Sequence, residues 1–134
     1  MERIKVLLVE PMEEPKLIEI EHTLENLQEL VGGDLQAVYP WEDPVAVIVC
    51  DDDGKYKGYI ANRILADEDG KPYDLICGPF FICGLTTENF GSISDELAKK
   101  YTEMFRFPEM FLRGEDGKVF WCRLGSGEEP KIIG

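Results

Sequence analysis

The sequence has 134 residues, of which 44% are hydrophobic, and it carries 27 acidic side chains against 14 basic ones for a formal net charge of −13. A chain of this length can bury a complete hydrophobic core, and its apolar and aromatic content excludes intrinsic disorder. The phosphates of nucleic acids and anionic membranes need Lys and Arg to neutralise them. We therefore expect one acidic domain that makes no direct contact with DNA, RNA or membranes.

Apolar or alternating runs predict short strands along most of the chain. The first run, residues 3–9, is aliphatic at nearly every position, which is typical of a strand covered on both faces. Further strands are expected at residues 16–21, 35–39, 45–50, 56–60, 73–77, 80–83, 109–113 and 119–124.

Two helices are predicted, at residues 23–31 and 95–105. Thr23 and Ser94 are suitable N-caps, and Gly32 suits the left-handed position that ends the first helix. Asp95 and Glu96 favour the positive dipole end of the second helix. Apolar residues recur on one stripe of each helix, which indicates that one face of each packs on a sheet.

The dipeptide Asp-Gly, followed by Lys, occurs three times between apolar runs, at residues 53–55, 69–71 and 116–118. Asp-Gly tolerates the positive φ angles of type I′ hairpin turns, so each copy predicts a reversal between antiparallel strands. Together these elements predict an α+β fold, with a mostly antiparallel or mixed sheet of about seven short strands and two helices in a single domain.

We expect this domain to span residues 1–124, followed by a loosely ordered tail at residues 125–134, where Gly125, Gly127 and Pro130 lie. The sequence shows neither a signal peptide nor an apolar run of about 20 residues, which a membrane helix needs. Three of the four cysteines lie in apolar runs, which is typical of buried, reduced thiols. A cytoplasmic protein is expected.

No recognisable catalytic constellation is present. His22 is the only imidazole, no serine sits in a Gly-x-Ser-x-Gly elbow, and no phosphate-binding or dinucleotide motif occurs. An EF-hand register on Gly54 or Gly70 puts apolar residues at its first and last positions, so the acidic runs 51–53 and 67–69 are better explained as turns. We predict a non-enzymatic protein with no catalytic residues, metal site or cofactor.

Three residues are candidate binding residues for a protein partner. Trp41 lies in a proline-bounded loop, either as an exposed anchor or folded back on the core. Asn62 and Arg63 interrupt an apolar run, so they are either buried and hydrogen bonded or directed at a partner. If Arg63 is buried, we expect an internal ion pair with nearby acids: Asp67, Glu68, Asp69 or Asp74.

Three blocks carry a resemblance to a known family: LQELVGGDLQAVYP at residues 27–40, ANRILADEDGKPYD at 61–74 and GPFFICG at 78–84. The sequence resembles an uncharacterised bacterial domain of unknown function, found in Gram-positive gut bacteria, their phages and conjugative elements. The resemblance covers residues 5–107. The resemblance implies that the chain comes from a mobile element, on which members of the family are sometimes encoded beside antirestriction genes. It implies no particular activity.

Two functions follow as hypotheses. The first is a small protein-interaction or regulatory module of a phage or mobile element, acting on an unknown protein partner. The alternative is an acidic DNA mimic, of the antirestriction type, that occupies the DNA site of a DNA-binding enzyme. A mimic needs carboxylates spaced like the phosphates of a duplex, whereas a module needs an exposed apolar anchor.

Overall fold

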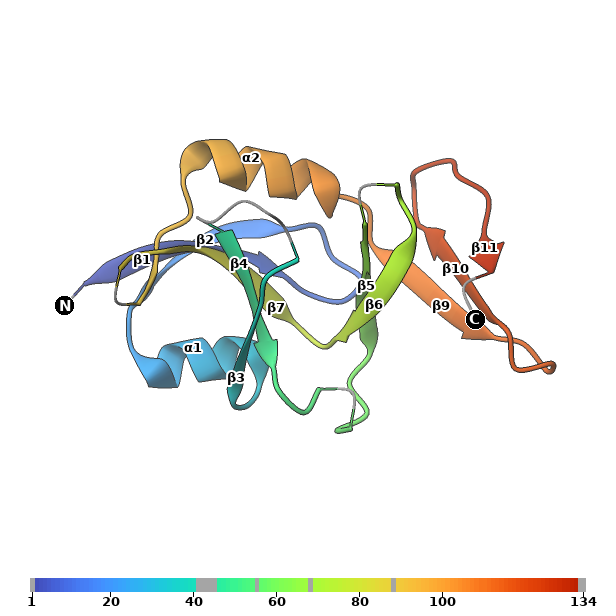
Figure 1. The fold of residues 1–134 in the computed structure, drawn as a ribbon, viewed down its shortest axis with the longest axis horizontal. Coiled ribbons are helices and arrows are strands. Elements are labelled where there is room, and N and C mark those ends of the chain that lie inside the picture. The colour runs from blue at the N-terminus through green and yellow to red at the C-terminus, as the bar shows by residue number, and fades with distance from the viewer. Residues whose placement is uncertain (1, 41–45, 55, 68, 88, 133–134) are drawn as a thin grey trace.

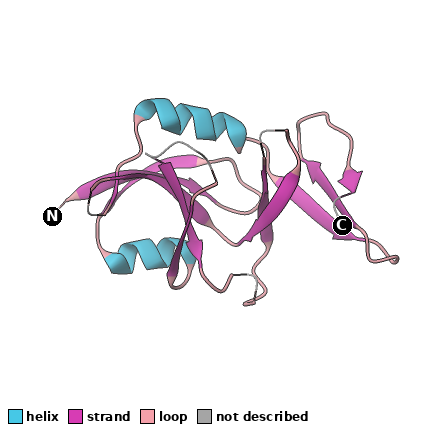
Figure 2. Ribbon diagram, in the orientation of Figure 1, coloured by secondary structure: helices cyan, strands magenta, loops and turns pink. Residues whose placement is uncertain are grey.

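The computed structural model describes residues 2–40, 46–54, 56–67, 69–87 and 89–132, which form an α+β domain with antiparallel sheets (Figures 1 and 2). The helices are α1 (Leu24–Val31) and α2 (Asp95–Met104). The strands are β1 (Arg3–Val9), β2 (Lys16–Glu21), β3 (Leu35–Val38), β4 (Ala46–Asp51), β5 (Ala61–Ala66), β6 (Pro72–Cys77), β7 (Phe80–Leu85), β8 (Phe90–Gly91), β9 (Glu109–Arg113), β10 (Val119–Arg123) and β11 (Lys131–Ile132). The predicted class is confirmed, but the described residues form eleven strands in three sheets rather than about seven in one.

The main sheet has the strand order β2-β1-β7-β4-β3, and β8 pairs with β7 outside this path. Every neighbouring pair is antiparallel. Figure 2 shows α1 and α2 on opposite faces of this sheet. A strand covered on both faces needs apolar side chains at successive positions, which explains the continuous run in β4, where every residue is buried.

The main sheet divides the core into two clusters. Successive residues of a strand point to opposite faces, so Val47 and Phe81 pack with α1 whereas Ile48 and Phe80 pack with α2. In the same way, Val6 belongs to the α1 cluster and its neighbour Leu7 to the α2 cluster. The prediction that the first strand is covered on both faces is confirmed.

Both helices begin where their capping residues predict. The Thr23 hydroxyl accepts a hydrogen bond from the Asn26 N–H at 3.2 Å, and the Ser94 hydroxyl accepts one from the Leu97 N–H at 3.2 Å. Gly32 follows α1 with φ 87°, the left-handed conformation that glycine adopts at low cost. These local signals mark the start of both helices and the end of α1.

The strand predicted at residues 56–60 is wrong. The N–H groups of Tyr56 and Lys57 both donate to the Asp53 carbonyl, and Gly58 has φ 75°, so this segment is a series of turns. The strand begins later, as β5, where the polar pair Asn62 and Arg63 breaks the apolar pattern by which a strand is recognised.

Two of the three Asp-Gly turns connect paired strands, at residues 69–70 between β5 and β6 and at 116–117 between β9 and β10. Gly70 and Gly117 have φ angles of 80° and 82°. The aspartates before them do not have positive φ, because Met12 is the only non-glycine with positive φ among the described residues. A type I′ turn needs positive φ at both positions, so these reversals are not type I′ as predicted. The copy at Gly54 lies between β4 and β5, which do not pair.

The remaining strands form two smaller sheets, the β5–β6 hairpin and a three-strand sheet in the order β11-β10-β9. Figure 1 places the three-strand sheet at the end of the long axis opposite the N-terminus, with the β5–β6 hairpin between it and the main sheet. The segment 125–134 was expected to be a loosely ordered tail. It contains β11, in which Lys131 and Ile132 pair with Trp121 and Phe120 of β10. Within the described ranges, no helix is long and apolar enough to cross a membrane.

Candidate functional site

The structure describes two of the three predicted binding residues. Trp41 lies outside the described residues, as do Val45, Lys55 and Glu68, which also entered the sequence predictions. Asn62 and Arg63 both have 0% exposure, so the pair corresponds to the buried alternative and not to a contact directed at a partner.

Asn62 connects three parts of the chain. Its Nδ2 group donates to the Val9 carbonyl at the end of β1 and to the Gly78 carbonyl before β7, both at 2.9 Å. Its Oδ1 accepts from Nη1 of Arg63 at 2.8 Å. A buried amide is stable only when its donors and acceptor are satisfied, and these contacts satisfy them.

The Arg63 guanidinium is bound mainly by main-chain carbonyls. Nη2 donates to Glu13 at 2.7 Å and to Phe105 at 3.0 Å, and Nε donates to Phe105 at 3.3 Å. Burial lowers the pKa of Arg63, and the negative charge of Glu109 opposes that shift. The side chain therefore uses carbonyls that are distant in sequence, where an ion pair with the acids of the neighbouring turn was predicted.

Glu109 joins the three-strand sheet to the β5–β6 hairpin. Its Oε1 accepts from the Ile64 N–H at 2.9 Å and from Nε1–H of Trp121 at 2.7 Å, and only 3% of the residue is exposed. Burial raises the pKa of Glu109, whereas these hydrogen bonds and the charges of Arg63 and Arg123 oppose the increase. Asn62, Arg63 and Glu109 thus form a buried polar junction between the parts of the fold.

An exposed row of apolar side chains crosses the three-strand sheet. Phe120 on β10 lies directly opposite Leu112 on β9 and Ile132 on β11, and directly opposed residues share one face of a sheet. Leu112 is 60% exposed, Ile132 56% and Phe120 38%. The row therefore presents three large apolar side chains to solvent.

The neighbouring positions extend this row into a wholly apolar face. Side chains two residues apart share a face, which adds the half-buried pair Met110 and Cys122. We call these five residues the three-strand face: Met110, Leu112, Phe120, Cys122 and Ile132. The opposite face holds buried Trp121, whose ring lies 5.0 Å from the Arg123 guanidinium and 5.4 Å from Nζ of Lys131.

Sequence analysis missed this face. A signal was present, because β9 and β10 carry apolar residues at both inner and outer positions, although a small surface sheet ordinarily alternates apolar with polar residues. The pairing of Ile132 with Phe120 was not readable, since the last strand has only two residues.

Charge is distributed unevenly along the chain. Residues 1–104 hold 9 basic and 22 acidic side chains, whereas residues 105–134, which we call the neutral end, hold 5 of each. Within the neutral end, Lys118 lies 3.9 Å from Asp116, and Arg123 lies 3.6 Å from Glu128. The three-strand face thus belongs to the part of the chain without net charge.

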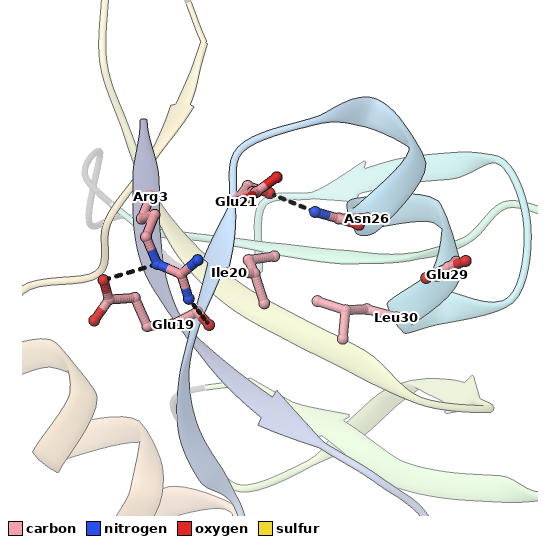
Figure 3. Close-up of a pocket in the computed structure, with 7 residues that line it drawn as sticks. All are labelled: Arg3, Glu19, Ile20, Glu21, Asn26, Glu29 and Leu30. Carbon is pink, nitrogen blue, oxygen red and sulfur yellow. Dashed lines mark hydrogen bonds and ion pairs between the residues drawn. The ribbon is translucent and has the colours of Figure 1, made fainter. Parts of the chain in front are cut away.

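A second candidate is the cavity of ≈ 470 Å³ between β2 and α1. Figure 3 shows Ile20 and Leu30 between the two elements, with Arg3 and Glu19 to one side. Nε of Arg3 donates to Oε1 of Glu19 at 3.2 Å, and both side chains are about half exposed. The charged residues that line the cavity, Arg3, Glu19, Glu21 and Glu29, are all exposed, so it lacks the converging buried polar groups of a ligand site.

A third candidate is a cavity of ≈ 320 Å³, lined by residues that include Cys50, Asp51, Asp74 and Cys77. Buried Asp51 accepts from Nζ of Lys57 at 2.8 Å and from the Asp53 N–H at 2.9 Å. Burial alone raises the pKa of Asp51, but these hydrogen bonds outweigh it and lower the pKa. The carboxylate therefore holds the turn after β4. In the described part of the chain, no three His, Cys, Asp or Glu side chains gather as a metal site.

Comparison with known proteins gives one match. The family model described as "Domain of unknown function (DUF3846)" matches residues 4–106, which contain both helices and, apart from Arg3 at the start of β1, the strands β1 to β8. No curated protein and no solved structure matches the chain significantly. The family match ends before β9, so the three-strand face lies outside the matched segment.

Proposed function

The chain belongs to the DUF3846 family, and from this premise we propose that it is a small protein-interaction module that contacts a protein through the three-strand face. The matched family domain has no known function, and the contact surface lies on the three-strand sheet that follows it in the sequence. The resemblance at the sequence level supports a bacterial protein of a phage or other mobile element as part of this proposal.

The exposed row of Leu112, Phe120 and Ile132 carries the proposal. Leaving large apolar side chains in water costs about 25 cal/mol for each Å² that an interface could bury. Single exposed apolar residues are ordinary, but a contiguous apolar face is typical of an interaction site. Phe120 lies between the other two, and central aromatic residues are the usual anchors of protein interfaces.

The buried polar groups support a role without catalysis. Asn62 and Arg63 direct their hydrogen bonds mostly to main-chain carbonyls, and Glu109 accepts from a main-chain N–H and from Trp121. Groups used in this way stabilise the fold and are not presented to a substrate. We therefore expect no enzymatic activity.

The variant with Leu112→Ser and Ile132→Ser should lose protein binding while it remains folded. Tagged protein is incubated with a lysate of cells that express the untagged chain, at about 1 M salt, which screens ion pairs. The complexes are cross-linked so that weak ones survive washing, and the retained proteins are analysed by mass spectrometry. We expect about tenfold or greater loss of a specific retained protein, because the variant removes two apolar contacts beside Phe120. That protein can be another protein of the lysate or the untagged chain.

The matched control is Leu24→Ser, which replaces a leucine of 61% exposure on α1, far from the three-strand face in the structure. The control should retain the same proteins as the original sequence. If the face variant also retains them, the three-strand face is not the contact surface and the proposal is wrong.

The DNA-mimic alternative makes a different prediction in the same assay. The acidic excess lies entirely in residues 1–104, so a mimic would use this segment and would leave the neutral end free. Its partner should leave at about 1 M salt and in the presence of competing duplex DNA, and the face variant should not affect it. Retention that depends on the face and resists salt supports the module instead.

A further inference from the structure

We propose that the partner of the three-strand face is the same face of a second copy of this chain, arranged about a two-fold axis. This inference rests on the proposed function, because it requires the face to be a contact surface. It goes further by naming the occupant as a copy of the chain itself.

The shape of the face suits packing against itself. Phe120 lies at the centre of the row, with Leu112 on one side and Ile132 on the other. A two-fold axis that passes Phe120 between the sheets and runs parallel to the strands would place the Leu112 side of one copy over the Ile132 side of the other. Two sheets that pack face to face lie about 10 Å apart and interdigitate their side chains, as they do in a sandwich. The five residues of the three-strand face are uncharged, and Lys118, two residues before Phe120, lies 3.9 Å from Asp116.

The distribution of charge favours a second copy at this end of the molecule. Two chains of net charge −13 repel each other wherever their acidic segments meet. The neutral end has no net charge, and it lies at the end of the long axis opposite the N-terminus (Figure 1). Contact through the three-strand face therefore joins the two neutral ends and needs no acidic segment in the contact.

Charge also distinguishes a second copy from a basic partner protein. A strongly basic partner would be attracted to the acidic residues 1–104, where the 22 acidic side chains outnumber the 9 basic ones. The neutral end offers such a partner no net attraction. An apolar face on an electrically neutral surface is complementary to another neutral surface, and the chain carries such a surface itself.

The size of the face sets the strength of the dimer. A strand of five residues is about 17 Å long and three strands are about 14 Å wide, so the face has an area of about 240 Å². This area is well below the roughly 800 Å² that each partner buries in a standard interface. We therefore expect a reversible dimer that forms with rising protein concentration.

Sedimentation velocity of the purified chain, from micromolar to millimolar concentration, tests the proposal. The mass should rise from 15.2 kDa toward twice that value, and more readily at about 0.5 M salt than at about 0.05 M, because salt screens the repulsion between the acidic segments. The variant with Leu112→Ser and Ile132→Ser should associate about tenfold or more weakly, while Leu24→Ser associates as the original sequence does.

A chain that stays at 15.2 kDa throughout this range overturns the dimer, and so does a face variant that associates as strongly as the original. The lysate experiment then separates the two proposals. If another protein is still retained through the face, only the second copy is wrong as the occupant. If retention is also independent of the face, the proposed function fails with it.

Discussion

Replacing Arg63 by methionine lowers the free energy of unfolding by about 3 kcal/mol or more, although methionine fills much of the same volume. The substitution removes the guanidinium but leaves the Glu13 and Phe105 carbonyls, which accept from it at 2.7 and 3.0 Å, in the buried junction. Urea unfolding at neutral pH, followed by tryptophan fluorescence, measures the change.

The control for Arg63 is the lysine variant. Arg63→Lys keeps a positive charge, but a single ammonium cannot reach the carbonyl of Glu13, the carbonyl of Phe105 and Oδ1 of Asn62 with the planar geometry of a guanidinium. We expect a loss of stability close to that of methionine. If the lysine variant is as stable as the original sequence, the positive charge and not the hydrogen-bond geometry of Arg63 stabilises this junction, and our account of Arg63 is wrong.

Replacing Glu109 by alanine lowers the free energy of unfolding by about 2–3 kcal/mol. The Ile64 N–H and the Trp121 indole N–H both donate to Oε1 of Glu109, and alanine leaves both without this acceptor. Glu109→Gln keeps an amide oxygen at that place, so its loss should be below about 1 kcal/mol. Urea unfolding of the two variants separates the hydrogen bonds from the charge, and equal losses would contradict this account.

The pH dependence of the same pair checks the charge of Glu109. Burial raises the pKa of Glu109, so the folded state holds its proton more tightly than the unfolded state does. The protonated Glu109 carboxyl therefore contributes its full stability below the pKa that it has in the unfolded state. This contribution is lost as pH rises through the pKa of Glu109 in the folded state. Relative to Glu109→Gln, the original sequence should lose stability as pH increases from acid toward neutral. A constant difference would show that this carboxyl does not titrate as the structure indicates.

Elements defined by local interactions were predictable from the sequence. Thr23, Gly32 and Ser94 lie within one turn of the helix ends that they fix, and their signals do not depend on the remainder of the fold. Apolar runs identified the central strands because a strand with both faces covered is apolar at nearly every position.

β5 was missed because its polar residues have partners that are distant in the chain. Arg63 bonds to residues 13 and 105, and Asn62 to residues 9 and 78. A local reading of the sequence offers nearby acids as partners for Arg63, and only the folded chain brings these carbonyls within reach. Buried polar junctions of this kind therefore appear in the sequence as interruptions of a pattern, without a sign of what satisfies them.

The three-strand face was missed for a related reason. Its five residues come from three strands, and the row exists only through the register that pairs Phe120 with both Leu112 and Ile132. The sequence offered Trp41 as the apolar anchor of an interaction, and this residue lies outside the described residues. Trp121, the other tryptophan, is buried against Glu109 and does not present its ring as an anchor.

The most direct test of the interaction surface uses the cysteine that lies within it. Cys122 belongs to the three-strand face, whereas Cys77 is also half-buried but lies on β6. The rates at which a membrane-permeable reagent alkylates these two thiols are compared by mass spectrometry in expressing cells and in dilute purified protein. If a protein covers the face in the cell, alkylation of Cys122 should slow there relative to Cys77. An unchanged ratio of the two rates would contradict the proposal that this face is a contact surface.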